Sequence, residues 1–289
     1  MLRDGITGDW IGTFEGHQGA VWSAKLDSQA IRAATGSADS TARLWNALNG
    51  DCMHTFEHKR VVRTVDFCPT ANVLATGGYE AIVRLYNLEK PTLDPTVLSI
   101  PNFNSRIKKL LWAPDGRTLY MGSEDGVLRQ WDLSTGKIAR DLTGLFSHDP
   151  TKSGINDMEL NPHDHTLTIA VGEHVSFVDT NSFTLLRSHH LGREIETASR
   201  HPVHGKTYLA GGSDVWVRLY DTETGNELLT QKGHHGKVHC LRFSPSGSTY
   251  TSGADDATIR MWRYDEPNRS SNNDKSSNIS TTTTTSSSH

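Results

Sequence analysis

A pattern of apolar and polar positions recurs along the chain, with the form apolar-x-x-apolar-x-apolar-x-Pro. Side chains of a strand alternate between two faces, so each copy predicts a half-buried β-strand. Proline ends each copy because it cannot donate a hydrogen bond to a sheet. Regular copies occupy residues 62–69, 107–114, 155–162 and 238–245. Two altered copies lie at 21–28, where Ser28 replaces the proline, and at 195–202, where Arg200 replaces an apolar residue.

Three further strands are predicted after each copy. The second is short and rich in small residues, as at 33–36, 74–77 and 250–253, and tight turns such as 38–40 and 255–257 follow it. The third ends in a basic, apolar, aromatic and polar run, found at 43–46, 84–87, 129–132, 218–221 and 260–263 and, in degenerate form, at 176–179. A fourth strand follows, as at 51–56 and 227–230.

Four antiparallel strands repeating every 41 to 47 residues are typical of the blades of a β-propeller. Such units cannot bury their apolar faces alone and must stack on their neighbours. The sequence therefore predicts an all-β propeller over residues 1–265, with six complete sets of the first three strands. No long helix is expected in this body.

The two ends of the propeller depart from the repeat. Residues 9–14 form an outer strand with no blade before it, and Gly8 and Phe14 align with Gly50 and Phe56. Residues 266–289 are rich in Ser, Thr and Asn and predict a disordered tail, which leaves the last blade without its own outer strand. The orphan strand can pair with the last blade and close a six-bladed ring, because pairing removes two exposed edges. Alternatively, a leading blade is missing and the ring is open or strained.

Two repeats share a set of polar side chains with the same intervals, which we call the tetrads. They are His17, Thr35, Asp39 and Trp45, and His234, Ser252, Asp256 and Trp262. A third set has His58, Thr76, Glu80 and Tyr86. A carboxylate, an imidazole, a hydroxyl and an indole N–H can form a chain of hydrogen bonds within one blade.

These sets are predicted to be structural. A hydrolase would use such residues once, whereas here they recur, and the hydroxyl lies in a strand without a nucleophile elbow. An enzyme would require Ser252→Ala to abolish activity while leaving the fold intact; we expect a destabilised blade instead. No catalytic residue, cofactor or enzymatic activity is predicted.

Composition narrows the remaining possibilities. The 289 residues carry 29 basic and 33 acidic side chains and a net charge of −4, without the basic excess expected of a nucleic-acid binder. Three cysteines without C-x-x-C spacing, and histidine pairs without a second ligand cluster, predict neither disulfides nor a metal site. No apolar run approaches the roughly 18 residues of a membrane span, and the N-terminus does not resemble a signal peptide.

The Gly16-His17 and Gly233-His234 pairs, together with the aromatic-polar strand ends, resemble the WD40 repeat family over residues 1 to about 265. Longer segments at 7–14, 64–67, 76–78, 107–109 and 233–245 resemble one branch of it. The resemblance implies a seven-bladed, non-catalytic scaffold in which a leading segment supplies the inner strands of the first blade.

Members of that branch are components of the survival-of-motor-neuron (SMN) complex, with its Gemin proteins, which assembles spliceosomal small nuclear ribonucleoproteins (snRNPs) for mRNA splicing. The branch also associates with receptor serine/threonine kinases and inhibitory Smads, which is the alternative function here. The resemblance implies a monomer within a larger protein complex, located in the cytoplasm and secondarily in the nucleus.

The resemblance also implies where partners bind. In WD40 proteins the recurrent contact positions ring the top face, the end at which the innermost strands begin. For about half of these positions the alternative is an ordinary solvated surface without a partner. We expect Trp22, Arg63 and Tyr79 to contribute most to binding, because Trp, Tyr and Arg are frequent binding anchors. The corresponding positions are Trp22, Arg63, Lys108, Asn156, Glu196 and His239, then Arg106, Glu194 and Lys237, and finally Tyr79, Glu124 and Asp255.

Overall fold

The structure is a computed structural model that describes residues 1–143, 154–161, 163–266 and 283–285. Within these ranges the regular structure consists of β-strands, and no helix capable of crossing a membrane is found. The strands form six four-stranded antiparallel sheets and one two-stranded sheet. The all-β propeller expected from the repeat is confirmed.

Each four-stranded sheet is one blade. Blade one contains β3 (Val21–Leu26), β4 (Arg32–Ser37), β5 (Thr41–Asn46) and β6 (Cys52–Glu57). Blade two contains β7 (Val62–Phe67), β8 (Val73–Gly78), β9 (Val83–Asn87) and β10 (Thr96–Leu98). Blade three contains β11 (Ile107–Trp112), β12 (Thr118–Ser123), β13 (Leu128–Asp132) and β14 (Lys137–Leu142).

The second half of the ring follows the same order. Blade four contains β15 (Ile155–Asn161), β16 (Thr166–Val171), β17 (His174–Asp179) and β18 (Thr184–His190). Blade five contains β19 (Ile195–Arg200), β20 (Thr207–Gly212), β21 (Val217–Asp221) and β22 (Glu227–Gln231). Blade six contains β23 (Val238–Phe243), β24 (Thr249–Ala254), β25 (Thr258–Arg263) and β26 (Thr283–Thr285).

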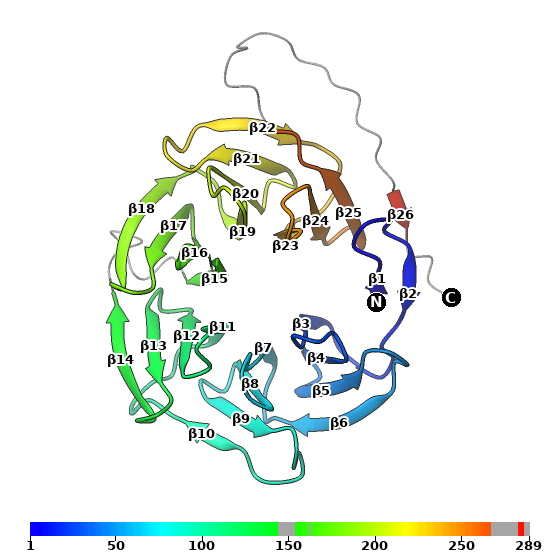
Figure 1. Cartoon of the computed structure of the whole chain (residues 1–289), viewed down its shortest axis with the longest axis vertical. Coiled ribbons are helices and arrows are strands. Elements are labelled where there is room, and N and C mark those ends of the chain that lie inside the picture. Colours follow the sequence, from blue (N-terminus) through cyan, green and yellow to red (C-terminus); the bar gives the residue numbers. More distant parts are fainter. Residues whose placement is uncertain (144–153, 162, 267–282, 286–289) are drawn as a thin grey trace.

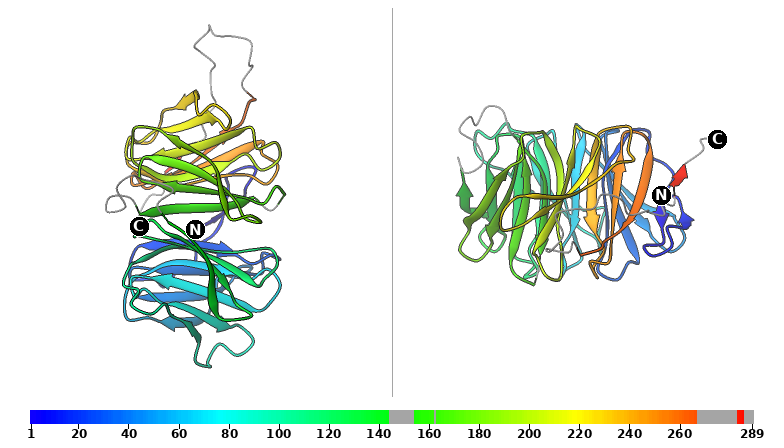
Figure 2. Two further views of the ribbon diagram at one scale, coloured as in Figure 1. Left: turned by 90° about the vertical axis from the view of Figure 1, so that its left-hand side faces the viewer. Right: turned by 90° about the horizontal axis from the view of Figure 1, so that it is seen from above.

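The blades follow one another around a central axis in sequence order (Figure 1). The first strand of each blade lies nearest the axis, and later strands lie progressively outward. Seen from the edge, the strands of successive blades stand side by side in a thick disc (Figure 2). All innermost strands therefore begin at the same end of the disc, which places their first residues on one face.

The core lies between neighbouring blades. The first residue of an innermost strand packs on a small residue of the preceding blade. A Cβ atom added to Gly36 would lie 2.9 Å from Val62 Cγ1, and one added to Gly77 would lie 3.0 Å from Ile107 Cγ2. Glycine permits this close approach between sheets. Val62 and Ile107 are each only 1% exposed as a result.

Hydrogen bonds add a second link between blades. Ser23 Oγ accepts from the backbone N–H of Val65 in the next blade at 3.3 Å. Thr64 Oγ1 accepts from the N–H of Leu110 at 3.0 Å in the same way. Two residues further along β7, Asp66 Oδ2 accepts from the N–H of Trp112 at 2.8 Å. The third and fifth positions of an innermost strand thus hold the backbone of the following one.

The expected pairing of the N-terminal outer strand with the last blade is wrong. That segment, β2 (Trp10–Gly12), pairs with β1 (Leu2–Arg3) and forms the separate two-stranded sheet. A local turn favours this hairpin, because Asp4 Oδ1 accepts from the N–H groups of Ile6 and Thr7 at 2.8 Å each. Closing so short a loop loses less chain entropy than joining strands from opposite ends of the chain.

The hairpin is half of a further blade. Its register pairs Leu2 with Gly12 and Arg3 with Trp10. In blade one, Leu44 pairs with His54 and Trp45 with Cys52, which is the same register 42 residues further along. β1 and β2 therefore correspond to the third and fourth strands of a blade, as the alignment of Gly8 with Gly50 indicates.

The outer strand of blade six also differs from expectation, because residues 283–285 take that position. β26 pairs antiparallel with β25, with Thr258 opposite Thr285 and Arg260 opposite Thr283. The edge of β25 offers unpaired backbone groups to this segment. Residues 267–282 and 286–289 of the expected disordered tail lie outside the described residues.

Candidate functional site

The two tetrads each form a continuous chain of hydrogen bonds. In blade one, Trp45 Nε1 donates to Thr35 Oγ1 at 2.8 Å, and Thr35 lies 2.7 Å from His17 Nε2. His17 Nδ1 lies 2.8 Å from Asp39 Oδ2. The carboxylate can only accept, so it takes the Nδ1–H of the ring; Nε2 then accepts from the hydroxyl, which itself accepts from the indole N–H. The group links the inner and outer parts of one blade.

Blade six repeats this arrangement. Trp262 Nε1 donates to Ser252 Oγ at 2.8 Å, Ser252 Oγ lies 2.7 Å from His234 Nε2, and His234 Nδ1 lies 3.1 Å from Asp256 Oδ2. Burial raises the pKa of Asp256, but hydrogen bonds from Thr258, the His235 backbone and His234 outweigh it and hold that pKa below its usual range. Burial lowers the pKa of His234. The ring is therefore a neutral hydrogen-bonding spacer.

The third set is organised differently because an arginine enters it. Arg84 donates to His58 Nδ1 at 2.8 Å and to Glu80 Oε2 at 2.6 Å, and so separates the imidazole from the carboxylate. Tyr86 Oη and Thr76 Oγ1 lie 3.3 and 3.4 Å from His58 Nε2. Burial, reinforced by the charge of Arg84, lowers the pKa of His58 to about 4. This blade thus has an Arg–Glu ion pair where the others have a His–Asp contact.

On the top face, the candidate partner-binding residues Trp22 and Arg63 are stacked. The guanidinium carbon of Arg63 lies 3.8 Å from the ring centroid of Trp22. Trp22 is 42% exposed, although it is a large aromatic residue. Arg63 Nη1 is buried and has no hydrogen-bond partner among the described residues. An exposed indole held in place by a stacked guanidinium is well suited to bind another protein.

A second stacked pair lies on the neighbouring blades. The guanidinium carbon of Arg106 lies 4.5 Å from the ring centroid of Tyr79. Glu124 contacts both Arg106, at 3.6 Å, and Lys108, at 3.8 Å. Because these side chains are solvent-exposed or half-buried, the ion pairs add little to stability. They bring Lys108 and the Arg106 that stacks on Tyr79 to the same carboxylate instead.

The remaining candidates lie farther around the same face. Lys237 Nζ lies 2.5 Å from Glu196 Oε1 and 3.7 Å from Glu194. His239 Nε2 lies 2.7 Å from Asp255 Oδ1, and its ring centroid lies 6.4 Å from that of Trp22. Asn156 Nδ2 donates to the Ile195 carbonyl. Trp22 therefore contacts residues of both the second and the sixth blade.

Sequence reasoning missed a charged network near the axis. Arg242 of β23 donates to both carboxylate oxygens of Asp157 in β15, at 2.7 and 2.8 Å, and so passes over blade five. Lys109 Nζ lies 2.8 Å from Asp157, and Thr197 Oγ1 donates to it at 2.7 Å. Burial raises the pKa of Asp157, but the charges of Arg242 and Lys109 outweigh it and hold that pKa well below its usual range. The sequence signal that could have revealed this network is a charged residue at the third or fifth position of an innermost strand. Lys109 and Asp157 occupy the third position, and Arg242 occupies the fifth.

Metal binding and disulfide formation were the other kinds of site considered from the sequence. Within the described part of the chain, no three His, Cys, Asp or Glu side chains converge as metal ligands would. Cys52, Cys68 and Cys240 are free thiols. A polar, ion-paired face and repeated internal tetrads are the features that stand out.

Repeated blades of this kind, five of the six with an aromatic residue near the end of the third strand and two of them holding a His–Asp tetrad, define a WD40 β-propeller. The family model described as "IFT122 first beta-propeller" matches residues 2–263. The serine-threonine kinase receptor-associated protein of Gallus gallus is 41% identical over 263 residues, covering 91% of this chain and 72% of that protein. Its Dictyostelium discoideum counterpart is 43% identical over 264 residues, covering 91% and 86%.

A more distant relative is subunit I of eukaryotic translation initiation factor 3 from Bombyx mori, which is 29% identical over 284 residues. The chain belongs to the WD40 family of serine-threonine kinase receptor-associated proteins. Repeat folds of this type present extended surfaces to binding partners, and the chain is a scaffold of that class.

Proposed function

We propose that the protein is a non-catalytic adaptor that binds other proteins through its top face. The stacked pairs Trp22–Arg63 and Tyr79–Arg106, on successive blades, carry the proposal. Trp, Tyr and Arg are the residues most enriched among binding hot spots. A partner segment bearing carboxylate or carbonyl oxygens would fit this surface.

The finer role that we propose is assembly of spliceosomal snRNPs in the cytoplasm, with SMN-complex proteins as the partners. It is supported by the sequence resemblance and by the near-neutral charge of the chain, which suits protein rather than RNA contacts. A second candidate is an adaptor for receptor serine/threonine kinases and inhibitory Smads. The name of the relatives, serine-threonine kinase receptor-associated protein, favours that second role.

The test compares the Trp22→Ala/Arg63→Ala protein with wild type by affinity purification and mass spectrometry. A matched control is Trp10→Ala/Arg140→Ala, which removes an exposed tryptophan and an exposed arginine from outer strands. We expect partner recovery to fall at least tenfold in the first variant only, with an unchanged melting temperature.

The identity of the lost partners decides between the two roles. Loss of Sm-assembly proteins supports snRNP assembly, and loss of kinases supports signalling. Equal recovery from wild type and the Trp22→Ala/Arg63→Ala variant would contradict the top-face assignment.

A further inference from the structure

The candidate positions of blades five and six are paired with one another and carry a net negative charge. Lys237 Nζ lies 2.5 Å from Glu196 Oε1 and 3.7 Å from Glu194 Oε2. His239 Nε2 lies 2.7 Å from Asp255 Oδ1. Three carboxylates thus surround one lysine and one histidine, and this half of the top face repels further anions.

The candidate positions of blades two and three have the opposite charge. Three of them are the cations Arg63, Arg106 and Lys108, and one is the carboxylate Glu124. Glu124 lies 3.6 Å from Arg106 Nε and 3.8 Å from Lys108 Nζ, and both distances exceed hydrogen-bond length. Arg63 contacts the ring of Trp22 and forms no ion pair with a described residue. No described carboxylate is therefore hydrogen-bonded to these three cations.

Two further cations extend this positive surface. Lys59 and Arg60 are exposed in the turn that leads into β7. Glu80 Oε1 fixes the turn by accepting from their backbone N–H groups at 2.5 and 3.3 Å. The charge of Glu80 does not neutralise the two side chains, because its other oxygen accepts from Arg84. We call Lys59, Arg60, Arg63, Arg106 and Lys108 the basic sector.

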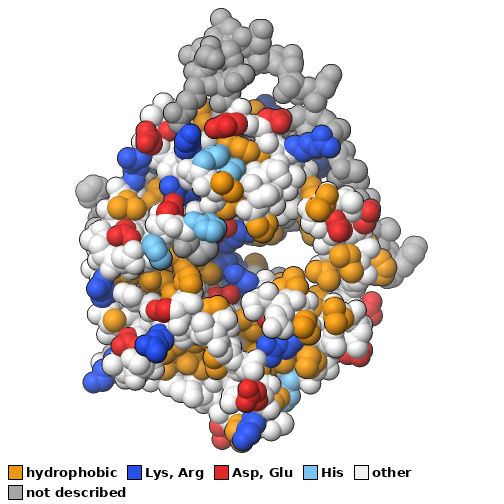
Figure 3. Space-filling model, viewed as in Figure 1, with side chains coloured by type: hydrophobic (Ala, Val, Ile, Leu, Met, Phe, Trp, Pro, Cys, Tyr) orange, Lys and Arg blue, Asp and Glu red, His pale blue; other side chains and the backbone are white. Residues whose placement is uncertain are grey.

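The basic sector lies where a partner can reach it. Blades two and three stand side by side in the ring (Figure 1), which is hollowed at its centre (Figure 3). Arg63 and Lys108 are the second residues of the innermost strands β7 and β11, so they lie at the rim of this hollow. Burial lowers the pKa of Arg63. A cation partly removed from water in this way is stabilised when an anion approaches it.

We propose that the basic sector binds a carboxylate-rich peptide segment of the partner protein, with Arg63, Arg106 and Lys108 as the principal contacts. This inference rests on the proposed adaptor function and specifies the chemistry of its partner. The planar guanidinium groups of Arg63 and Arg106 are already oriented by stacking on aromatic rings, so they lose little freedom when they bind a carboxylate. Repulsion by blades five and six confines the segment to one half of the face.

An acidic peptide fits this surface better than RNA. Glu124 is 41% exposed within the basic sector, and Glu194 and Asp255 continue the same face around the ring. A continuous phosphate backbone would meet these carboxylates, whereas the acidic side chains of a peptide can be spaced to avoid them. The net charge of −4 also lacks the basic excess of a nucleic-acid binder.

The test measures fluorescence anisotropy of a labelled peptide of six Glu-Gly repeats with the full-length protein at low salt. Arg106→Glu/Lys108→Glu should bind this peptide at least tenfold more weakly than wild type. The matched control is Lys137→Glu/Arg140→Glu, which makes the same change of charge at exposed positions of the outer strand β14 in the same blade and should bind like wild type.

Two further variants separate binding from folding. Arg106→Gln/Lys108→Gln removes both charges without adding a carboxylate beside Glu124, and should weaken binding at least threefold. Glu124→Gln should strengthen binding at least twofold, because the internal competitor for Arg106 and Lys108 is lost. All these variants should melt like wild type, since exposed ion pairs contribute little to stability.

Several outcomes would overturn the proposal. They are no binding of the acidic peptide, equal binding of a Ser-Gly or Lys-Gly peptide, or an equal loss in the Lys137→Glu/Arg140→Glu control. Tighter binding of an oligouridylate of the same charge would assign the basic sector to RNA.

Failure here is distinguishable from failure of the adaptor function. If the acidic peptide does not bind but Trp22→Ala/Arg63→Ala still loses its partners, the adaptor function stands and the acidic partner is wrong. If the peptide binds as expected but that variant keeps its partners, the top-face adaptor function is wrong.

Discussion

Removing the hydroxyl of Ser252 is expected to destabilise the protein strongly. Ser252 is 1% exposed and lies between two buried side chains, Trp262 at 3% and His234 at 4% exposure. Ser252→Ala leaves the indole N–H of Trp262 without an acceptor and Nε2 of His234 without a donor. The 2.8 Å and 2.7 Å contacts are both lost, and no water-sized space is created by deleting one oxygen.

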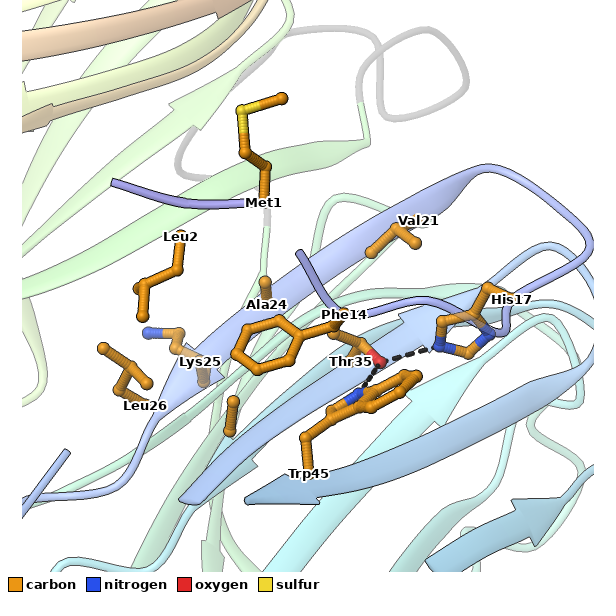
Figure 4. A pocket seen from close by; sticks show the side chains of 11 residues that line it. Met1, Leu2, Phe14, His17, Val21, Ala24, Lys25, Leu26, Thr35 and Trp45 are labelled. Atoms are coloured by element: carbon orange, nitrogen blue, oxygen red, sulfur yellow. Dashed lines mark hydrogen bonds between the residues drawn. The ribbon is translucent and has the colours of Figure 1, made fainter. Parts of the chain in front are cut away.

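The expected size follows from the two orphaned groups. A buried polar group left without a partner costs about 1–3 kcal/mol, so the two groups orphaned by Ser252→Ala should together lower the free energy of unfolding by roughly 2–6 kcal/mol. The equivalent change in blade one, Thr35→Ala, should cost less. Thr35 borders a cavity of about 390 Å³, lined also by Phe14 and Trp45, from which water can reach the groups left behind (Figure 4).

Urea denaturation followed by tryptophan fluorescence measures both variants. Ser246→Ala, at an exposed serine in a turn of the same blade, is the control and should stay within about 0.5 kcal/mol of wild type. A Ser252→Ala protein as stable as that control would refute the view that the tetrads stabilise the blades. A loss larger for Thr35→Ala than for Ser252→Ala would refute the argument from water access.

Two further predictions concern packing and pH. Val62→Ala should lower the free energy of unfolding by about 2 kcal/mol, whereas Val21→Ala should cost less than about half of that, because Val62 is 1% and Val21 49% exposed; equal losses in urea denaturation would contradict this difference in burial. Acidification should destabilise the fold through His58, whose pKa is about 4 when folded and about 6.5 when unfolded. Its contribution is complete above pH 6.5 and declines as the pH falls toward 4, by roughly 3 kcal/mol in all. Wild type should therefore lose more stability than His58→Gln between pH 7 and pH 4, and parallel stability curves would contradict the assignment.

The repeated strands could be predicted from sequence because their signals are local. Alternation and a terminal proline position the innermost strands, as the agreement of the 62–69 copy with β7 illustrates. The positions of the third strands can be predicted from the aromatic residue near their end. A fourth strand was expected in every blade, but the position of β10 could not be predicted, because Thr96–Leu98 has only three residues and no recurring signature.

Closure could not be predicted in the same way, because it depends on competition between pairings far apart in the chain. The hydrogen bonds of Asp4 settle that competition in favour of the hairpin, and they involve side-chain geometry that no period reveals. The tetrad intervals suffice to indicate which side chains meet. The position of Arg84 between His58 and Glu80 could not be predicted from these intervals. Arg84 follows Glu80 by four residues and binds the carboxylate that the histidine would otherwise contact.

The contact from Arg242 to Asp157 has a mechanical consequence. It fastens blade six directly to blade four, with Lys109 of blade three and Thr197 of blade five attached to the same carboxylate. One carboxylate therefore connects blades three to six. Slow opening motions of the ring should then concentrate outside this network, at blade one, which begins with Val21 and carries Trp22.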